Sequence, residues 1–384
     1  MLVRRRNPMR SSRPEGLPDP GFWQGRRVLL TGHTGFKGSW MLEWLEAMGA
    51  EVTGMSLAPE GPVSLFEGLH GLARLDGEII DIRDADAVQR RVAEVQPEIV
   101  FHLAAQSLVR RGYADPSMTY AVNIGGTLNV LKAVAEIGSA RAVVVTTTDK
   151  VYRNDGSGRA FVETDLLGGD DPYSKSKAIC EMVVSAYRDH LEDQGCHIAA
   201  ARAGNVIGGG DWAADRLIPD AVRAWERCEK FHVRRPDATR PFQHVLEPLR
   251  GYMVLAEKLV GIARFAPAYN FGPFEPGAKV RDVLHLVARH FDPAPVVYPD
   301  RIEGPHEAAT LSLDPSLAAR DLGVSPVWGL EETVARTAGW YRAFADGADP
   351  RDLCLADRMA YFAALLKGAT AKPEDARDGN AEVA

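Results

Sequence analysis

The chain has 384 residues, of which 46% are hydrophobic and 25% are charged. These ordinary globular fractions exclude intrinsic disorder, a collagen-like chain and a repeat array. The net charge of −7 argues against a general nucleic-acid binder, which would carry a basic surplus, but it permits a local basic pocket for one anionic ligand.

The sequence shows no sign of export, membrane insertion or metal binding. No stretch approaches the roughly 20 apolar residues of a membrane helix, and Arg4, Arg5 and Arg6 precede polar sequence instead of the apolar run of a signal peptide. The four cysteines are widely spaced and form no Cys-x-x-Cys pair, which is typical of a reducing cytoplasm. We therefore expect a cytoplasmic protein with no membrane, nucleic-acid or metal partner, and a disordered tail over residues 1–21.

The first folded segment has the pattern of a nucleotide-binding βαβ unit. An apolar strand over residues 28–31 leads directly into Gly32-His-Thr-Gly35-Phe-Lys-Gly38, a helix over 39–48 and a second strand over 51–57. Glycines in this context let the backbone turn tightly and approach a pyrophosphate, which then lies on the helix N-terminus. The G-x-x-G-x-x-G spacing resembles that of the short-chain dehydrogenase/reductase superfamily.

Strands and helices continue to alternate as far as residue 205. We expect strands over residues 78–80, 99–103, 142–147 and 197–202, and helices over 85–95, 120–137 and 173–191. This alternation of apolar strands with helices predicts an α/β fold with a doubly wound parallel Rossmann sheet.

Prolines and glycines become frequent after Asn205, where we expect a helix that ends near residue 260 and a short strand over 269–272. The predicted domains are an NAD-binding Rossmann domain over 22–204, to which some later segments return, and an interleaved, smaller C-terminal α/β substrate lobe over 205–345. A C-terminal helix and a frayed tail are expected over 346–384.

The cofactor is only partly specified by the sequence. The second strand ends in Met55-Ser56-Leu57, with neither the carboxylate that would bind a ribose nor an arginine for a 2′-phosphate, so NAD and NADP both remain open at this site. Asp81-Ile82 suits the adenine edge, although Asp81 is equally suited to capping a helix. Small residues after the fourth strand, at Leu103-Ala104-Ala105, let the backbone approach a nicotinamide ribose, and Asn123 binds backbone or water near the site or is a surface residue.

Tyr173 and Lys177 lie four residues apart and therefore on one helix face. A lysine ammonium beside a phenol lowers the pKa of the phenol, so that a tyrosinate can act as a general base near neutral pH. Such a pair is common by chance, but Thr146-Thr147-Thr148 ends a strand about 25 residues earlier and adds a hydroxyl. Together these residues predict a redox site of the short-chain dehydrogenase/reductase type.

Asp149 and Lys150 directly follow this threonine run, at the carboxyl end of a strand, where open α/β sheets bind their ligands. An extra acid and an extra amine suit the elimination of water, in which the acid protonates the leaving hydroxyl and the base removes a carbon-bound proton. As a base, Lys150 must be neutral, which burial or the charge of Lys177 would favour. The alternative is a salt-bridged loop pair without a catalytic role.

Several motifs together resemble the CDP-glucose 4,6-dehydratase family of extended short-chain dehydrogenase/reductases, over about residues 22–341. They are Thr31-Gly-His-Thr-Gly-Phe-Lys-Gly38, Thr147-Thr-Asp-Lys-Val-Tyr152, Asp171-Pro-Tyr-Ser-Lys-Ser-Lys177, Arg202-Ala-Gly-Asn-Val-Ile-Gly-Gly-Gly-Asp-Trp212, Arg216-Leu-Ile-Pro-Asp220, Arg240-Pro-Phe-Gln-His-Val-Leu-Glu-Pro248, and Pro305-His-Glu-Ala308 with Leu313-Asp314.

The resemblance implies a lyase that feeds deoxysugar synthesis and uses one tightly held NAD. Tyr173 would take the proton of the sugar 4-hydroxyl while hydride passes from C4 to NAD, and Thr148 would hold the 4-oxygen. Lys150 would remove or relay the C5 proton, and Asp149 would protonate the departing C6 hydroxyl. Hydride would return to C6, and Lys177 would bind the nicotinamide ribose and lower the pKa of Tyr173.

The resemblance also assigns binding residues. Those predicted to contact the cofactor are Gly32, His33, Gly35, Phe36, Lys37, Gly38, Asp81, Ile82, Leu103, Ala104, Ala105, Thr146, Tyr173 and Lys177. Those predicted to contact the CDP-glucose substrate are Gln106, Ser107, Asn205, Arg216, Arg240 and His244, since arginine is the expected partner of a diphosphate.

Three alternatives and one expected partner follow from the same residues. A nucleotide-sugar 4-epimerase would need neither Asp149 nor Lys150, and a dehydratase could act on another NDP-hexose. A non-catalytic NAD sensor or scaffold would show degraded catalytic residues, whereas Tyr173 and Lys177 are intact. The helices over 120–137 and 173–191 resemble those that pair in dimers of this superfamily, so a homodimer or higher homo-oligomer is expected.

Overall fold

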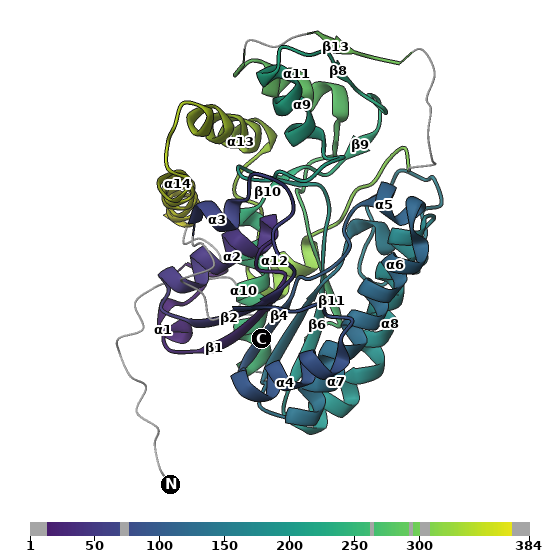
Figure 1. Cartoon of the computed structure of the whole chain (residues 1–384), viewed down its shortest axis with the longest axis vertical. Coiled ribbons are helices and arrows are strands. Elements are labelled where there is room, and N and C mark those ends of the chain that lie inside the picture. Colours follow the sequence, from purple (N-terminus) through teal and green to yellow (C-terminus); the bar gives the residue numbers. More distant parts are fainter. Residues whose placement is uncertain (1–13, 70–76, 262–264, 292–294, 300–307, 371–384) are drawn as a thin grey trace, which may run out of the picture.

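A seven-stranded parallel sheet forms the centre of the molecule (Figure 1). The structure is a computed structural model that describes residues 14–69, 77–261, 265–291, 295–299 and 308–370. The strand order is β11-β6-β5-β4-β1-β2-β3, and each neighbouring pair runs parallel. The strands are β1 (Arg27–Thr31), β2 (Glu51–Ser56), β3 (Gly77–Ile79), β4 (Ile99–His102), β5 (Ala142–Thr146), β6 (His197–Ala203) and β11 (Ala268–Phe271). The predicted doubly wound Rossmann sheet is confirmed.

Apolar runs form the central strands because both faces of the sheet are covered. Val28 and Leu30 of β1 face one hydrophobic cluster, and Leu29 faces another on the opposite side. Figure 1 shows the helices of the two layers. One layer holds α2 (Phe36–Ala47), α10 (Leu246–Gly261) and α12 (Ser316–Leu322), and the other holds α4 (Ala85–Val95), α7 (Gly126–Ile137) and α8 (Pro172–Asp193).

The start of α8 is fixed by the sequence around it. Asp171 caps the helix by accepting a hydrogen bond from the Ser174 backbone N–H at 3.0 Å, and Pro172 occupies the first turn, where its missing N–H costs nothing. This places Tyr173 in the first turn of α8 and Lys177 one turn later, at the carboxyl edge of the sheet.

The helix predicted over residues 120–137 is broken in the structure. It consists of α6 (Pro116–Tyr120), a π-helical turn (Ala121–Gly125) and α7. The π turn contains Asn123, which is buried and whose side chain bonds the backbone N–H and C=O of Gln106 at 2.8 and 3.0 Å and the Ser176 hydroxyl at 2.8 Å. Asn123 is therefore the backbone-binding residue that one of our two interpretations anticipated, and not a surface residue.

Further elements cover the carboxyl edge of the sheet. They are α3 (Leu65–Leu69), α5 (Val109–Ala114), a 3-10 turn (Asp149–Val151), β7 (Val206–Ile207), α9 (Leu217–Glu226), β8 (Phe231–His232), β9 (Thr239–Arg240), β10 (Gln243–His244), β12 (Ala278–Lys279), α11 (Val280–Ala288), β13 (Val296–Val297) and α13 (Leu330–Ala345). In Figure 1, β8, α9, α11 and β13 lie above the sheet, whereas α10 and β11 join the sheet layers although they follow residue 205.

The two ends of the chain differ from expectation in part. Residues 14–21 do not form a disordered tail, because α1 begins at Pro20 (Pro20–Trp23) and the Gly16 carbonyl accepts a hydrogen bond from Arg250 at 3.3 Å. The predicted C-terminal helix corresponds to α14 (Pro350–Thr370). Residues 1–13 and 371–384, and residues 305–307 of the Pro305-His-Glu-Ala308 motif, lie outside the described residues. No helix in the described ranges is long and apolar enough to cross a membrane.

Candidate active site

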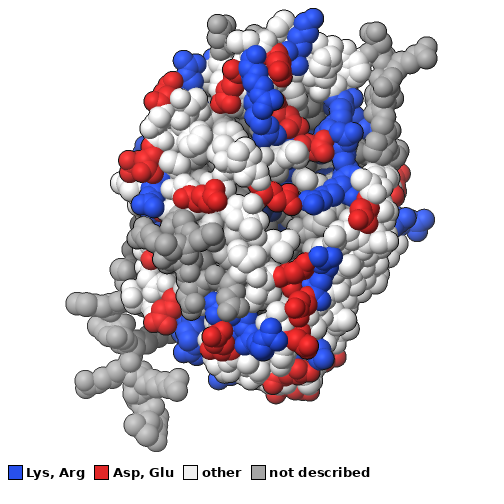
Figure 2. Space-filling model, in the orientation of Figure 1, with Lys and Arg blue, Asp and Glu red and all other residues white. Residues whose placement is uncertain are grey.

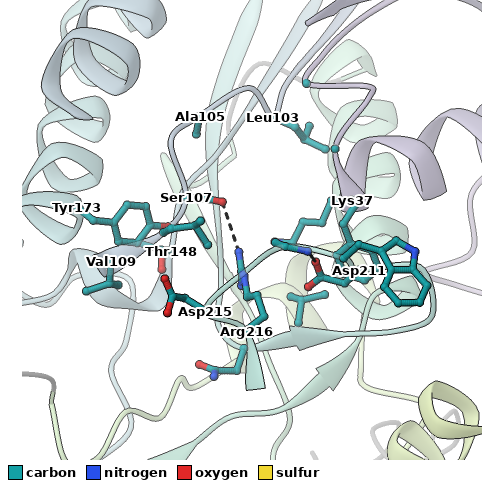
Figure 3. A pocket seen from close by; sticks show the side chains of 18 of the residues that line it. Lys37, Leu103, Ala105, Ser107, Val109, Thr148, Tyr173, Asp211, Asp215 and Arg216 are labelled. Atoms are coloured by element: carbon teal, nitrogen blue, oxygen red, sulfur yellow. Dashed lines mark hydrogen bonds between the residues drawn. The ribbon is translucent and has the colours of Figure 1, made fainter. Parts of the chain in front are cut away.

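A cavity of about 610 Å³ lies between the carboxyl ends of the strands and the segments above them. Figure 3 shows Tyr173 and Thr148 on one side, Lys37 and Asp211 on the other, and Arg216 with Ser107 between them. All of the predicted catalytic residues line this cavity, and so do all predicted binding residues except three. Those three are His33, Gln106 and His244.

The glycine loop has the shape that a dinucleotide requires. Gly32 has a positive φ of 76°, and a Cβ added there would lie 2.7 Å from the Ala104 backbone nitrogen, while a Cβ on Gly38 would lie 2.0 Å from the Gly32 carbonyl oxygen. Gly35 is the N-cap of α2, and no side chain caps that helix. Backbone N–H groups at the start of α2 therefore remain available to a pyrophosphate, and the chain fits NAD at this loop.

The adenosine end of the loop contains hydroxyl groups. The Thr34 hydroxyl lies 2.7 Å from the Ser56 hydroxyl and donates to the Leu57 carbonyl at 2.8 Å, which ties the loop to the end of β2. Asp81 follows β3 and lines the cavity. Its hydrogen bonds to the Arg83 side chain keep the pKa of Asp81 below its usual value, so the carboxylate is charged where the adenosine edge is expected.

Thr148, Tyr173 and Lys177 converge in the cavity as predicted. Lys177 is buried, and its Nζ donates to the Thr146 carbonyl at 3.0 Å. Burial lowers the pKa of Lys177, and the nearby Cys180 and Glu181 oppose that shift. Thr146 thus contributes its backbone oxygen to the site, while its hydroxyl donates to the His102 carbonyl.

The predicted lowering of the Tyr173 pKa is not found in the chain alone. Burial raises the pKa of Tyr173 to about 12, and the Asp149 charge adds to this. The neighbouring Thr148 side chain and the charge of Arg216 act in the opposite direction and lower the pKa of Tyr173. The four-residue helical spacing predicts that the Tyr173 and Lys177 side chains are adjacent, but Lys177 Nζ donates to the backbone of β5 instead.

Asp149 and Lys150 form a contact next to Thr148. Lys150 Nζ lies 3.2 Å from Asp149 Oδ1, and the Thr148 hydroxyl donates to the same oxygen at 2.9 Å. The Asp149 side chain is 1% exposed, and its Oδ2 finds no hydrogen-bond partner among the described residues. A Cβ on Gly204 would lie 2.4 Å from that oxygen, so glycine at 204 leaves the space that the carboxylate fills. The acid and the amine are thus held together beside Thr148.

The opposite wall concentrates positive charge. Lys37 extends from the first turn of α2, and burial followed by the charges of Arg216 and Lys177 lowers its pKa to about 7. Arg216 Nη2 lies 3.4 Å from the Ser107 hydroxyl. Buried Arg216 Nε and Asn205 Oδ1 lack hydrogen-bond partners within the described residues. Unsatisfied polar atoms in a cavity are suited to a polar ligand.

The cavity differs in charge from the whole chain. Among its described lining residues, eight are Lys or Arg and six are Asp or Glu, although the chain carries −7 overall. Figure 2 shows acidic and basic side chains interspersed over this face, with basic side chains gathered beside a hollow in its upper half. The local surplus suits a dianionic ligand such as a diphosphate.

Three predicted binding residues lie outside the cavity lining. The His33 ring packs at 5.2 Å from Phe66, under β2 at Gly54. The Gln106 side chain donates to the Thr119 hydroxyl at 2.9 Å and accepts from the Leu108 backbone N–H at 2.6 Å. These contacts make both residues parts of the wall and not ligand contacts, because their polar atoms are directed into the protein.

His244 is the third correction. Its ring is fully buried between Trp40 and Trp328, at centroid distances of 6.0 and 4.8 Å. Burial lowers the pKa of His244 to about 3, so the ring is neutral and unsuited to holding a diphosphate. Arg240 does line the cavity, and its Nη1 donates to the Thr239 carbonyl at 2.9 Å.

The structure adds residues that we did not single out from the sequence. Asp211 is buried in the cavity wall, and burial raises its pKa. Asp215 joins Arg110 of α5 and Arg234 after β8, with distances of 2.8 and 2.7 Å to its Oδ1. Asp211 belongs to the motif Arg202–Trp212 and could have been found from it. Asp215, Arg110 and Arg234 come from separate segments and meet only in the folded chain.

Comparisons with known proteins cover most of the chain. Residues 29–337 match the family described as GDP-mannose 4,6 dehydratase. The CDP-glucose 4,6-dehydratase of Salmonella typhimurium strain LT2 is 46% identical over 341 residues, which are 86% of this chain and 94% of that protein. The dTDP-glucose 4,6-dehydratase of Streptomyces griseus is 28% identical over 84% of this chain and 96% of its own length.

Solved structures share the fold. A dTDP-glucose 4,6-dehydratase from Streptomyces venezuelae with NAD bound has a TM-score of 0.70 and 25% identity, and the match covers 85% of this chain and 99% of that one. The UDP-glucose 4-epimerase of Thermus thermophilus in complex with NAD has a TM-score of 0.69 and 26% identity, over 82% and 99% of the two chains.

Proposed function

Because the chain belongs to the GDP-mannose 4,6-dehydratase family, within the extended short-chain dehydrogenase/reductases, we propose that it is an NAD-dependent nucleotide-sugar 4,6-dehydratase. The proposed reaction converts CDP-D-glucose to CDP-4-keto-6-deoxy-D-glucose and water. The observation that carries the proposal is the Asp149–Lys150 contact of 3.2 Å beside Thr148 and Tyr173. A 4-epimerase has no use for this acid and amine, because it eliminates nothing.

The glycine loop and the start of α2 would hold NAD, which would supply a reversible hydride acceptor for the sugar carbons C4 and C6 and be unchanged overall. The chain's own residues manage the protons. Tyr173 accepts the proton of the 4-hydroxyl, and Thr148 holds the 4-oxygen, which is consistent with the position of both side chains on one side of the cavity (Figure 3). The 4-ketone then acidifies the proton on C5.

Lys150 and Asp149 carry out the elimination. A proton that moves from Lys150 to Asp149 across their contact gives a neutral amine and a carboxylic acid without any change in total charge. Lys150 takes the C5 proton, Asp149 protonates the C6 hydroxyl as it leaves as water, and the ion pair is restored. Lys150 returns its proton to C5 when hydride reaches C6. The proton that Tyr173 took from O4 balances the one that Asp149 gave to water.

The anionic part of the substrate fits the opposite wall. Arg216 and Asn205 present buried polar atoms without hydrogen-bond partners in the described chain, and a guanidinium suits a diphosphate. The choice of cytosine as the base is supported by the 46% identity to the Salmonella typhimurium protein. His244 and Gln106 have no part in this binding scheme.

A substrate screen tests the proposed function. Purified protein with NAD is incubated separately with CDP-, dTDP-, GDP- and UDP-glucose, and products are identified by mass spectrometry and NMR. We expect a 4-keto-6-deoxy product from CDP-glucose without net formation of NADH. Steady NADH accumulation, a 4-epimer as product, or turnover of a different nucleotide sugar only would contradict the proposal.

The pH dependence of kcat/KM for CDP-glucose should follow the charge state of Lys37. Its pKa of about 7 means that it is charged below that pH and neutral above it. We therefore expect wild-type kcat/KM for CDP-glucose to fall by about tenfold above pH 7, because one charge-assisted contact is lost. Lys37→Met should show the lower value throughout, and Lys37→Arg the higher value throughout. If kcat/KM of Lys37→Met still fell by the same factor above pH 7, this role of Lys37 would be contradicted. KM values measured separately for NAD and for CDP-glucose show which of the two diphosphates Lys37 contacts.

We also propose a homodimer formed through α7 and α8. Leu128 of α7 and Met182 of α8 are 42% and 56% exposed, so both helices present apolar side chains to solvent. A monomer in light scattering would contradict this proposal.

Cytoplasmic location is supported by four cysteines without disulfides, three of them buried, and cell fractionation tests it.

A further inference from the structure

One face of α8 carries a third ionisable group besides Tyr173 and Lys177. Glu181 follows Lys177 by four residues, and the same spacing separates Lys177 from Tyr173, so the three share a face. Glu181 does not line the cavity, and its side chain is 5% exposed. Its carboxylate forms a buried ion pair with Arg202 of β6, whose Nε lies 2.8 Å from Glu181 Oε1.

This ion pair binds the residue just before the catalytic segment Thr148–Asp149–Lys150. The Thr147 hydroxyl donates to Glu181 Oε1 at 2.7 Å. The Thr147 backbone N–H donates to the Ala201 carbonyl on β6 at 2.9 Å. Thr147 is therefore fixed to α8 at Glu181 itself and to β6 at Ala201, the residue before Arg202.

The same ion pair binds Tyr152, beyond the other end of the segment. Arg202 Nη1 donates to the Tyr152 hydroxyl at 2.7 Å, and that hydroxyl donates to Asn270 Oδ1 of β11 at 2.6 Å. The Tyr152 ring stacks on Phe161 with a centroid distance of 4.8 Å. Tyr152 is 2% exposed and Asn270 is fully buried, so this end of the segment is held inside the protein.

We propose that the Glu181–Arg202 ion pair positions the elimination residues relative to the redox residues. It joins the helix that carries Tyr173 and Lys177 to both ends of the segment that carries Asp149 and Lys150. The inference rests on the proposed function, because only a dehydratase must align both sets of residues on one sugar. A misplacement of about 1 Å can lower a rate by about 10²-fold, so such a link has a direct catalytic use.

Stability alone is a poor explanation of the pair. Desolvation of two charges offsets most of their attraction, and buried ion pairs can often be replaced by apolar residues at little cost. The pair also has an electrostatic effect on the site, since the Glu181 charge raises the pKa of Lys177 against the effect of burial.

The test compares Glu181→Gln and Tyr152→Phe with Glu247→Gln. Tyr152→Phe removes one hydroxyl and keeps the stack on Phe161, so it should fold. Glu247 is a matched control, because it is a buried carboxylate that accepts from Trp328 N–H at 2.8 Å and Tyr361 at 2.6 Å, outside the cavity lining. Thermal unfolding, kcat, KM and pH profiles are measured for all three.

We expect kcat to fall by about 10²-fold in Glu181→Gln and about tenfold in Tyr152→Phe, with KM for CDP-glucose within about threefold of wild type. Glu247→Gln should lose thermal stability but keep kcat within about threefold. In Glu181→Gln alone, the alkaline limb of the profile should move to lower pH, because Lys177 loses a neighbouring negative charge.

Two results would overturn the proposal. One is a kcat for Tyr152→Phe and Glu181→Gln that matches the control, and the other is a loss of kcat in all three variants in proportion to lost stability. Failure of the proposed function is a separate result, since it is seen as the inactivity of the wild-type enzyme on CDP-glucose before any variant is compared.

Discussion

Replacing Asp149 by asparagine is expected to lower the rate of 4-keto-6-deoxy product formation by about 10²- to 10⁴-fold, the usual contribution of a general acid. Asparagine keeps the size of the side chain, and its carbonyl can still accept from Thr148, but it cannot deliver a proton to the leaving C6 hydroxyl. Oxidation at C4 should persist, because the Asp149 charge is one of the causes that raise the Tyr173 pKa and its removal favours deprotonation. Stopped-flow absorbance of reduced nicotinamide and product analysis measure the two steps separately.

Asp237→Asn is the control for this variant. It removes a carboxylate that is 63% exposed and paired with Arg281 on the surface, so product formation should stay near the wild-type rate. Loss of C4 oxidation in Asp149→Asn, in parallel with loss of product, would mean that Asp149 supports the redox step. Undiminished formation of the 4-keto-6-deoxy product would contradict the proposed role of Asp149 as the acid.

The sequence predicted what depends on local pattern. Tyr173 and Lys177 share a helix face because the helical repeat is fixed, and Asp149 and Lys150 reach the cavity because residues at the ends of parallel strands meet at one edge of a sheet. The glycine loop was equally predictable, since strand, glycines and helix follow one another directly in the chain. In each case, the chemistry follows from the position of a residue within one element.

The direction of side chains in loops and short strands was not predictable in the same way. His33 lies within the glycine loop, yet its ring is directed under β2 toward Phe66, and His244 faces two tryptophans from distant segments. These directions depend on packing partners that are far away in the sequence. The Glu181–Arg202 pair was missed for the same reason, because α8 and β6 bring its members together only in the folded chain.

Replacing Tyr173 by phenylalanine is expected to lower kcat by about 10²- to 10⁴-fold and to abolish C4 oxidation together with product formation. Tyr173 is the proposed proton acceptor on the side of the cavity that also holds Thr148 (Figure 3), and Lys177 cannot replace it, since its Nζ is a donor to the Thr146 carbonyl. This variant therefore differs from Asp149→Asn, in which the reaction should proceed through C4 oxidation and be blocked at the elimination of water. Single-turnover absorbance of reduced nicotinamide distinguishes the two blocks.

Tyr187→Phe is the matched control, because Tyr187 lies further along the same helix, packs against a hydrophobic cluster and does not line the cavity. It should leave kcat within about threefold of wild type, as expected for a hydroxyl away from the reacting atoms.

The pH profile provides a second criterion. Burial holds the pKa of Tyr173 at about 12 in the chain alone, so a wild-type acidic limb near neutral pH would require the bound cofactor and substrate to supply the missing stabilisation of the phenolate. A limb that persists unchanged in Tyr173→Phe would instead assign that titration to another group and contradict the role of Tyr173 as the base.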